Sequence, residues 1–480
     1  MAFSFLQRLL TGKRNAPQPV RRPNILFIMA DQFRADALGA TGGWTRTRNL
    51  NRLAERGVVF ENVYANSVEC IPSRISLATG LYPHQTGIDI NRTCTLNPDF
   101  PNWMQALEQV GYQTSLIGKT HLHPHEGDLN DRIDLMHGYG LQNVDEITGP
   151  RASAFVKSNM TRLWEEQGLL KAYQDDFSDR FGNKPFVARP SVLPLELYYD
   201  RYVGDSACRQ LRELANDRPW FTWVSFGGPH EPWDAPEPYA SMYRAEDMPK
   251  PIPRPSAGAA QGLLKEAYAS TYTGPDISPE EVAALRANYA GNVTLIDDEI
   301  GRVLKVVDEL GQTENTLVIF TSDHGEMNGD FGLIYKSNFL DPAARVPLIV
   351  AWPGRTNGER SKALIELMDV AATMLDYADA KLPEASRAIS FRNVIEGHQT
   401  AHRDSVLSEF AGHGCLITSR YKAEFDLCGQ PSLLIRREYD AFEQNDLVSD
   451  SRLSGSVAAL QSAYFARKKK TPNVTEAVIQ

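Results

Sequence analysis

The chain of 480 residues has little cysteine and no long apolar run. Its five cysteines are odd in number and irregularly spaced, and no C-x-x-C pair occurs. This argues against a disulfide framework and against a cysteine-ligated zinc site. No stretch approaches the roughly 20 apolar residues that a membrane-spanning helix requires. The cysteine usage favours a reducing compartment, so we expect the protein in the cytoplasm, with the periplasm as the alternative.

Positive charge is also scarce, because 50 Lys and Arg residues are outnumbered by 60 Asp and Glu residues, which gives a formal net charge of −10. This balance argues against nucleic-acid binding and against long-range attraction of an anionic substrate. A site for an anion must therefore be built from local cations. Hydrophobic residues at 42% and charged residues at 23% are ordinary for a globular enzyme.

The N-terminal segment, residues 1–22, is basic, and we interpret it as an extension ahead of the first domain. Its apolar stretch is broken by Gln7 and Arg8, which makes it a poor secretory signal. Arg21 and Arg22 precede an apolar run, as in a twin-arginine export signal. That run, residues 24–29, is better explained as a core strand, which could not be cleaved away.

Apolar runs that predict strands alternate with stretches that predict helices. The run at 25–29 is continuously apolar between Pro23 and Asp31, as in a strand covered on both faces. Ser-Pro-Glu-Glu at 278–281 is a capping box and opens a long helix that reaches about residue 310. Further strands are expected at 58–60, 114–117, 220–226 and 316–320, and helices at 50–56, 103–110 and 208–215. The alternation predicts an α/β fold with a mostly parallel sheet and helices on both faces.

The most informative motif is Cys-Ile-Pro-Ser-Arg at 70–74. A lone cysteine is usually a small buried hydrophobe. Here Ser73 fits a helix N-cap and Gly80 fits the end of that helix. Cys70 would then lie just ahead of a helix N-terminus, where free N–H groups and the helix dipole favour an anion, and Arg74 adds a fixed positive charge. The arrangement suits a nucleophile that attacks a sulfate or phosphate ester.

Polar clusters follow four of the predicted strands. Because active sites of parallel sheets gather at the carboxyl ends of the strands, we expect these clusters to meet beside the helix that begins near Cys70. The clusters are Asp-Gln at 31–32, Gly-Lys-Thr-His-Leu at 118–122, Gly-Pro-His-Glu-Pro at 228–232 and Ser-Asp-His-Gly-Glu at 322–326.

Together these motifs resemble the type I sulfatases of the alkaline phosphatase superfamily, in which a maturation enzyme oxidises the cysteine of C-x-P-S-R to Cα-formylglycine. The matching blocks occur in the order of that family, and the resemblance covers roughly residues 23–375. It implies an alkaline-phosphatase-like catalytic domain at 23–385. It also implies a smaller C-terminal domain at 386–480, built on a short antiparallel sheet, with strands at 405–408 and within 415–425.

Carried over residue by residue, the resemblance implies one divalent metal ion. Asp31, Asp323 and His324 would hold it, the matured Cys70 would complete the site, and Gln32 would offer a carbonyl oxygen. Hard oxygen donors make Ca²⁺ the expected ion, with Mn²⁺ or Mg²⁺ as alternatives. Many family members have Asp in place of Gln32 and Asn in place of His324. Both variants resemble choline sulfatases and phosphonate monoester hydrolases, and the imidazole moves the preference modestly toward Mn²⁺.

The resemblance also implies groups that would bind a small anionic sulfate ester around Cys70. Arg74, Lys119 and Lys336 would hold the charged oxygens as local cations. Asn91, downstream of the helix that carries the nucleophile, would help to bind the substrate. The products would be an alcohol and inorganic sulfate.

Histidines would move the protons in this reaction. His230 is the candidate general acid on the leaving oxygen, since an imidazole works near neutral pH. His121 would deprotonate the formylglycine hydrate so that sulfate is expelled. The neighbouring His123 and His125 are expected to line a specificity loop rather than to bind metal. The poorly patterned stretch at 123–200 is expected to shape the substrate pocket.

Two other functions stay open. The first is a phosphonate monoester or phosphodiester hydrolase of the same superfamily with promiscuous sulfatase activity. Phosphonate hydrolases lack the lysine and histidine of the 118–122 block, so Lys119 and His121 favour a sulfatase. The second is a non-catalytic binding protein, which would not need acid, base and cations together. The sequence identifies neither the alcohol of the substrate nor the oligomeric state, and a homo-oligomer stays open.

Overall fold

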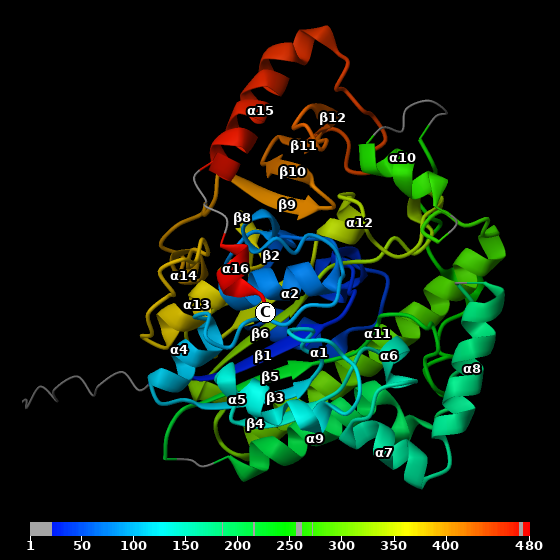
Figure 1. Ribbon diagram of the computed structural model, residues 1–480, viewed down its shortest axis with the longest axis vertical. Helices are drawn as coiled ribbons and strands as arrows, with labels where there is room; N and C mark the ends of the chain where they lie inside the picture. Colours follow the sequence, from blue (N-terminus) through cyan, green and yellow to red (C-terminus); the bar gives the residue numbers. More distant parts are fainter. Residues whose placement is uncertain (1–21, 185, 215–216, 256–261, 271, 470–473) are drawn as a thin grey trace, which may run out of the picture.

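The computed structural model describes residues 22–480 except 185, 215–216, 256–261, 271 and 470–473. At its centre is an eight-stranded sheet in the order β4-β3-β5-β1-β6-β7-β2-β8 (Figure 1). Neighbouring strands are parallel, except that β7 runs antiparallel to both β6 and β2. The strands are β1 (Asn24–Ala30), β2 (Val58–Tyr64), β3 (Gln113–Gly118), β4 (Asn143–Glu146), β5 (Trp220–Ser225), β6 (Thr316–Ser322), β7 (Leu348–Ala351) and β8 (Glu359–Glu366). The predicted α/β fold is confirmed, whereas the predicted extension at 1–22 lies outside the described residues apart from Arg22.

Strand β1 explains why the sequence shows an unbroken apolar run at this point. All seven of its residues are buried. Ile25, Phe27 and Met29 belong to the core on one face of the sheet, and Leu26 and Ile28 belong to the core on the other. Because successive side chains of a strand point to opposite faces, only a continuously apolar strand can serve both cores.

Helices cover both faces of this sheet. Side chains of α2 (Cys70–Thr79), α4 (Trp103–Gln109) and α13 (Asp369–Tyr377) pack in one core, and those of α1 (Arg48–Ala54), α9 (Tyr199–Glu213) and α11 (Pro279–Glu309) pack in the other. The remaining α-helices are α3 (Pro83–Thr86), α5 (Ile133–Gly138), α6 (Pro150–Ser153), α7 (Asn159–Glu166), α8 (Leu170–Asn183), α10 (Gly262–Ala269), α12 (Asp341–Ala344), α14 (Arg392–Ile395), α15 (Ser454–Lys469) and α16 (Thr475–Val478). None of the described helices is long and apolar enough to cross a membrane.

Helix boundaries follow the capping and spacing signals of the sequence. At the start of α11, Ser278 Oγ accepts from the backbone N–H of Glu281 at 3.2 Å, and the Glu281 carboxylate accepts from the N–H of Ser278 at 2.9 Å, as predicted. Helix α9 begins earlier than the predicted residue 208. Its residues Tyr199, Val203, Ala207 and Leu211 are buried at a spacing of four, which is the pattern of one helical face.

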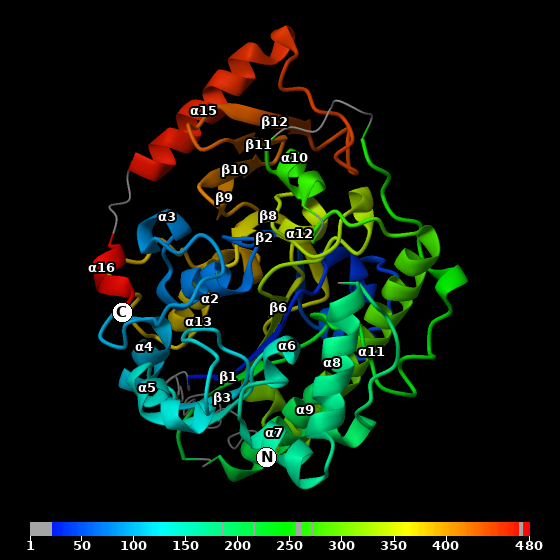
Figure 2. The ribbon, with the colours of Figure 1, turned by 45° about the vertical axis from the view of Figure 1, so that its right-hand side comes forward.

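A four-stranded antiparallel sheet in the order β12-β11-β10-β9 forms the upper part of Figures 1 and 2. Its strands are β9 (Ser405–Phe410), β10 (His413–Thr418), β11 (Tyr421–Phe425) and β12 (Pro431–Arg436). Helix α15 covers it, with the rings of Phe425 and Tyr464 stacked 4.4 Å apart. The predicted C-terminal antiparallel sheet is confirmed. The division near residue 385 falls between α13 and β9 and stays a prediction.

Gly118 ends β3 directly before Lys119, and no other residue fits its position. Its φ is +107°, a conformation that residues with a side chain rarely adopt. A Cβ atom there would lie 1.8 Å from the carbonyl oxygen of Ser225 in the neighbouring strand β5. The close approach of these two strand ends therefore sets the position from which the loop carrying Lys119 departs.

We expect Gly118→Ala to lower the free energy of unfolding by at least about 1–3 kcal/mol, because its backbone conformation alone carries that penalty. Gly111→Ala is the matched control, since φ at Gly111 is +93° but no heavy atom lies within 4 Å of the added Cβ. The midpoints of urea unfolding at equal m-values measure both losses. Equal losses in the two variants would show that the contact with Ser225 has no consequence.

Candidate active site

The four polar clusters of the sequence meet at one edge of the central sheet. Asp31 directly follows β1, Lys119 directly follows β3, and Asp323 directly follows β6. His230 lies in the loop that leaves β5, and Cys70 opens α2, which begins shortly after β2. Parallel strands with adjacent carboxyl ends bring these residues together although up to 292 positions separate them in the sequence: Asp323 and Asp31 both contact Arg74.

Helix α2 begins at Cys70 itself, so the prediction that Ser73 caps it is wrong. Glu69 is the extended residue before the helix, and the Ser73 hydroxyl instead donates to the carbonyl oxygen of Asp323 at 2.7 Å. The helix thus begins four residues earlier than predicted, and the Ser73 side chain makes a tertiary contact instead of a cap. Gly80 ends the helix in the left-handed conformation, as the sequence predicted. Cys70 is only 1% exposed.

Four buried side chains could hold a metal ion. The donor atoms of Asp31, Cys70, Asp323 and His324 all lie within 4.8 Å of one another, and Cys70 Sγ is 3.1 Å from His324 Nε2. His324 Nδ1 lies 2.9 Å from the Gly325 carbonyl oxygen, so its proton is directed to the backbone and Nε2 faces the cluster. Two carboxylates and one imidazole suit Ca²⁺, Mn²⁺ or Mg²⁺, and the residues therefore fit a divalent ion.

Gln32 borders this cluster in a left-handed conformation, with φ at 70°. Its amide nitrogen donates to the carboxylates of Glu231, at 3.0 Å, and Glu326, and its amide oxygen accepts from Lys336 Nζ. Burial and the nearby Glu231 carboxylate raise the pKa of Glu326 to about 7. Gln32 thus links two acidic side chains to a lysine, and its role as a metal ligand stays a prediction.

Arg74 lies behind the metal-site carboxylates and is completely buried. Its Nε donates to Asp323 Oδ2 at 2.8 Å, its Nη2 to Asp31 Oδ2 at 3.2 Å, and its Nη1 to the Lys119 carbonyl oxygen at 2.9 Å. Lys119 Nζ forms a second ion pair with Asp31. Arg74 therefore orients both carboxylates, and its contact with substrate oxygens stays a prediction.

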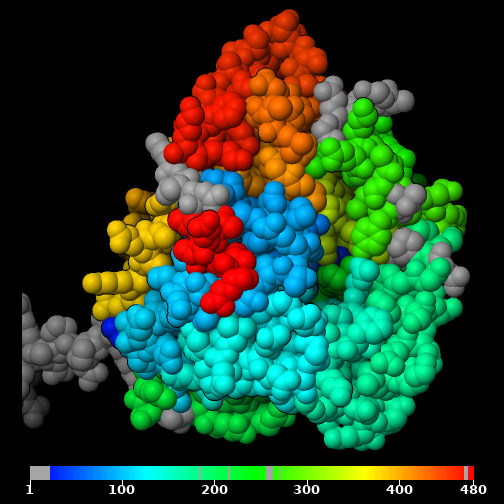
Figure 3. Space-filling model, viewed as in Figure 1, coloured from blue at the N-terminus to red at the C-terminus, as the bar shows by residue number. Residues whose placement is uncertain are grey.

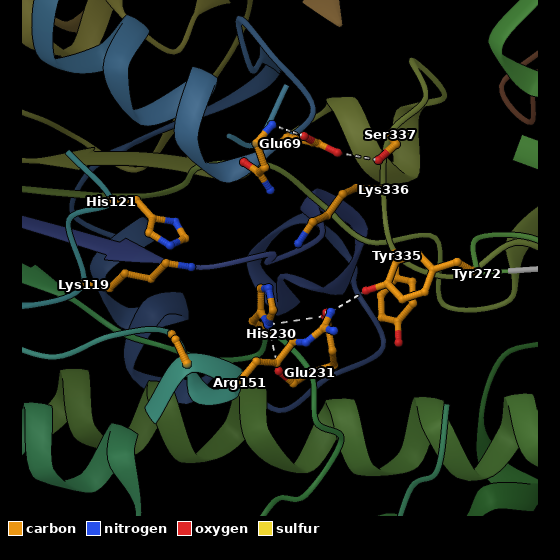
Figure 4. A pocket seen from close by; sticks show the side chains of 13 residues that line it. Glu69, Lys119, His121, Arg151, His230, Glu231, Tyr272, Tyr335, Lys336 and Ser337 are labelled. Atoms are coloured by element: carbon orange, nitrogen blue, oxygen red, sulfur yellow. Dashed lines mark hydrogen bonds and ion pairs between the residues drawn. The ribbon is translucent and has the colours of Figure 1, made fainter. Parts of the chain in front are cut away.

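A cavity of about 230 Å³ opens beside Cys70. In Figure 4, Lys119 and His121 lie on one side of it, Lys336 lies on the other, and His230 lies between them. Lys336 Nζ is 3.7 Å from Cys70 Sγ. Figure 3 shows the surface hollowed where the blue, teal and yellow-green parts of the chain meet. The cavity is lined by Glu69, Asn91, Lys119, His121, Gly149, Arg151, Ala152, His230, Glu231, Tyr272, Tyr335, Lys336 and Ser337.

The charges around this cavity set the protonation of Cys70 and His121. Burial and Asp31 act to raise the pKa of the Cys70 thiol, but Lys119, Lys336 and His324 outweigh them and hold that pKa well below its ordinary value. Burial, with Lys119 next, lowers the pKa of His121 well below its ordinary value. His121 is therefore a neutral imidazole at neutral pH, the form that a general base requires.

Several lining residues carry no sequence signal. Arg151 Nη1 lies 3.1 Å from Glu231 Oε1 and bonds to the Tyr272 hydroxyl. The rings of Tyr272 and Tyr335 stack 4.4 Å apart with 21° between their planes. The stretch at 123–200 contributes only Gly149, Arg151 and Ala152 to this wall. Asn91 also reaches the cavity, and its Oδ1 accepts from the backbone N–H of Ile71 at 2.9 Å.

Comparisons with known proteins agree with this geometry. The family model described as Sulfatase matches residues 23–380, and one described as N-sulphoglucosamine sulphohydrolase, C-terminal, matches residues 329–453. An arylsulfatase of Clostridium perfringens is 29% identical over 401 residues, which cover 81% of each chain. The multifunctional alkaline phosphatase superfamily protein PehA of Trinickia caryophylli is 32% identical over 420 residues, 81% of this chain and 80% of the relative.

The solved structure of a phosphonate monoester hydrolase from Silicibacter pomeroyi superposes with a TM-score of 0.78 at 26% identity, covering 94% of this chain and 96% of that one. The fold is thus the alkaline-phosphatase-like fold that the sequence predicted. Since the Sulfatase model matches well over half of the chain, the protein is a member of the sulfatase family, the sulfuric ester hydrolases of the alkaline phosphatase superfamily.

Proposed function

We propose that the protein hydrolyses a small sulfate ester to an alcohol and inorganic sulfate, with Cys70 matured to formylglycine and one divalent metal ion held by Asp31, Asp323 and His324. One observation carries the proposal: Lys119, His121, His230 and Lys336 line a single cavity beside Cys70. Two cations and two imidazoles are what the transfer of a sulfuryl group needs from a protein, namely charge stabilisation and proton transfer.

Cys70 Sγ stands in this structure for the hydroxyl oxygens of a formylglycine hydrate. Oxidation by a formylglycine-generating enzyme supplies a hydroxyl nucleophile that can later expel sulfate by returning to the aldehyde. The divalent ion supplies Lewis acidity toward the ester when it is bound. Because Cys70 is buried at the first turn of α2, the water that hydrates the aldehyde and the ester that is attacked would both reach residue 70 from the cavity.

The lysines hold the charged oxygens of the ester. Lys336 Nζ, 3.7 Å from Cys70 Sγ, reaches the position of the nucleophile, and Lys119 lies on the opposite side of the cavity from Lys336 (Figure 4). Because both ammonium groups are almost fully buried, their attraction to a developing negative charge is little screened by water. Arg74 would act indirectly, because its ion pairs with Asp31 and Asp323 orient these two carboxylates.

His230 has the geometry of the acid that protonates the leaving alcohol. Its Nδ1 lies 2.7 Å from the carbonyl oxygen of Glu231 and 3.3 Å from the Glu231 carboxylate. These contacts keep a proton on Nδ1 and leave Nε2 as the nitrogen that can serve the substrate.

A phosphonate monoester or phosphodiester hydrolase is the second candidate. It is favoured by the structural likeness to the hydrolase from Silicibacter pomeroyi and by Gln32 and His324 at the metal site. The neutral His121 and the buried Lys119 on the cavity wall favour the sulfatase, because the expulsion of sulfate needs a base beside residue 70.

Turnover of an aryl sulfate, an aryl phosphonate and an aryl phosphodiester with the same leaving group decides between the two candidates. We expect kcat/KM to be highest for the sulfate, because two lysines and a base serve it. All three rates are measured on one enzyme preparation of known metal content, so that differences in metal loading do not affect the comparison. A phosphonate or phosphodiester rate far above the sulfate rate would reverse the assignment.

A further inference from the structure

A second group of side chains that could bind a metal ion lies apart from the cluster of Asp31, Cys70, Asp323 and His324. His123 and His125 come from the loop that follows β3, and Glu146 is the last residue of β4. Their donor atoms all lie within 4.8 Å of one another. His123 Nε2 is 2.8 Å from Glu146 Oε2, and His125 Nε2 is 3.4 Å from Glu146 Oε1. The sequence alone favoured a specificity loop because it did not show that Glu146 joins the two histidines.

All three side chains are at most 3% exposed, so these contacts form away from solvent. Other groups orient the donors. The Thr120 hydroxyl donates to Glu146 Oε1, and His123 Nδ1 lies 3.0 Å from the Pro124 carbonyl oxygen, which directs Nε2 toward the carboxylate. Such a second set of contacts, a carbonyl behind an imidazole and a hydroxyl behind a carboxylate, is the usual support of protein metal ligands.

A simple ion pair explains only part of this arrangement. One imidazolium satisfies one carboxylate, but here two buried imidazoles converge on Glu146. Among the described residues, Nδ1 of His125 has no hydrogen-bond partner, so its Nε2 contact is its one polar anchor. Four tetrahedral ligands at about 2.0–2.1 Å from Zn²⁺ are separated by about 3.3–3.4 Å. The separation of His125 Nε2 from Glu146, 3.4 Å, matches this value, that of His123 Nε2, 2.8 Å, is shorter, and all three donors lie within 4.8 Å of one another.

We propose that His123, His125 and Glu146 bind one Zn²⁺ ion, with the fourth position left to a water molecule. Two imidazoles and one carboxylate suit zinc better than Ca²⁺ or Mg²⁺, which take oxygen ligands. When Zn²⁺ binds, it takes the place of the proton that His123 and Glu146 share in the metal-free site. The site uses none of the ligands of the Asp31 cluster, and the proposal does not depend on which ester the enzyme hydrolyses.

The ion would fasten the catalytic loop to the sheet. The loop that binds it also carries Lys119 and His121, and the ring of His121 lies against that of His125 with centroids 4.5 Å apart. Zinc at this site joins the loop after β3 to the end of β4. His123, His125 and Glu146 are thus positioning residues, which act on the reaction only through His121 and Lys119.

The test is the zinc content of the full-length protein after equilibration with Zn²⁺ and gel filtration. We expect wild type to keep one equivalent of zinc more than His125→Asn or Glu146→Gln. The matched control is His84→Asn, because His84 also pairs with a buried glutamate, Glu409, at 2.7 Å, but without a second histidine. Thr120→Val is expected to weaken binding by about 10–100-fold, as the loss of a supporting contact does.

Asp323→Asn separates the two metal sites, because it should lower occupancy of the catalytic cluster and leave the zinc equivalent in place. Substitution with Co²⁺ gives a second readout, since the intense visible absorption of a tetrahedral Co²⁺ site should be lost in Glu146→Gln. If His125→Asn does not fold, the zinc contents of Thr120→Val and Glu146→Gln still test the proposal. The proposal is overturned if wild type retains no more zinc than Glu146→Gln, or if the zinc is lost in Asp323→Asn instead.

Discussion

Replacement of Cys70 by alanine is expected to abolish sulfate ester hydrolysis, with kcat reduced by at least about 10⁴-fold. No described thiol lines the cavity itself, and Cys70 is the described cysteine whose pKa is lowered by the nearby cations Lys119 and Lys336. Cys208→Ala is the matched control, because Cys208 is also a buried thiol but packs on α9 in the opposite core. Steady-state rates with an aryl sulfate measure both effects.

Cys70→Ser sharpens the same prediction. A serine hydroxyl can accept the sulfuryl group but cannot expel sulfate by forming an aldehyde, so we expect release of about one alcohol per chain followed by arrest. Rapid mixing with an aryl sulfate would show this burst, and mass spectrometry of the peptide that carries residue 70 would identify the adduct. An unmodified thiol in a fully active preparation from the native host would refute the formylglycine mechanism.

His121→Asn is expected to lower kcat by about 10²–10⁴-fold, which is the usual contribution of a general base. The loss should fall on the release of sulfate, so that the variant accumulates a sulfated enzyme while its first turnover stays fast. Quenched samples analysed by mass spectrometry would show this species. His137→Asn replaces an exposed histidine and serves as the control. Slow alcohol release without accumulation would assign His121 to the first step instead.

The pH dependence of wild type tests the same residue. Burial, Lys119 and His125 hold the pKa of His121 well below its ordinary value of about 6.5, and a base is active only when unprotonated. As the pH falls through 6.5, His121 therefore stays neutral, and the rate of sulfate release should persist into more acidic solution. A loss of sulfate release centred near pH 6.5 would contradict this environment.

The fold could be predicted because its signals are local. The unbroken apolar run of β1, the capping box of α11 and the polar residues directly after strands each depend on a few adjacent positions. The meeting of Asp31, Cys70, Asp323 and His324 could be expected because parallel strand ends converge, whereas their role as metal ligands was implied by the resemblance to the sulfatases and stays a prediction. The predicted start of α2 was wrong because the Ser73 hydroxyl donates to the carbonyl oxygen of Asp323. That contact joins residues 250 positions apart, so no local pattern shows it.

The rest of the cavity wall could not be predicted for the same reason. Arg151 and Tyr272 carry no motif, and their contact spans 121 positions. Glu146 likewise stands in a stretch without a recognisable motif, and only the sheet places it beside His123 and His125. Sequence patterns indicate which face of a helix or strand is buried. Contacts such as that between Arg151 and Tyr272 depend instead on how loops distant in the sequence lie over the sheet.

The burial of Cys70 also sets a time limit during biosynthesis. Its neighbour His324 lies 254 residues further along the chain. At about 5–20 residues per second, a ribosome needs about 13–50 s to add them. Until then, the wall that covers the thiol does not exist. The proposed maturation enzyme must therefore act on a nascent or unfolded chain, and the rate of translation competes with the rate of oxidation.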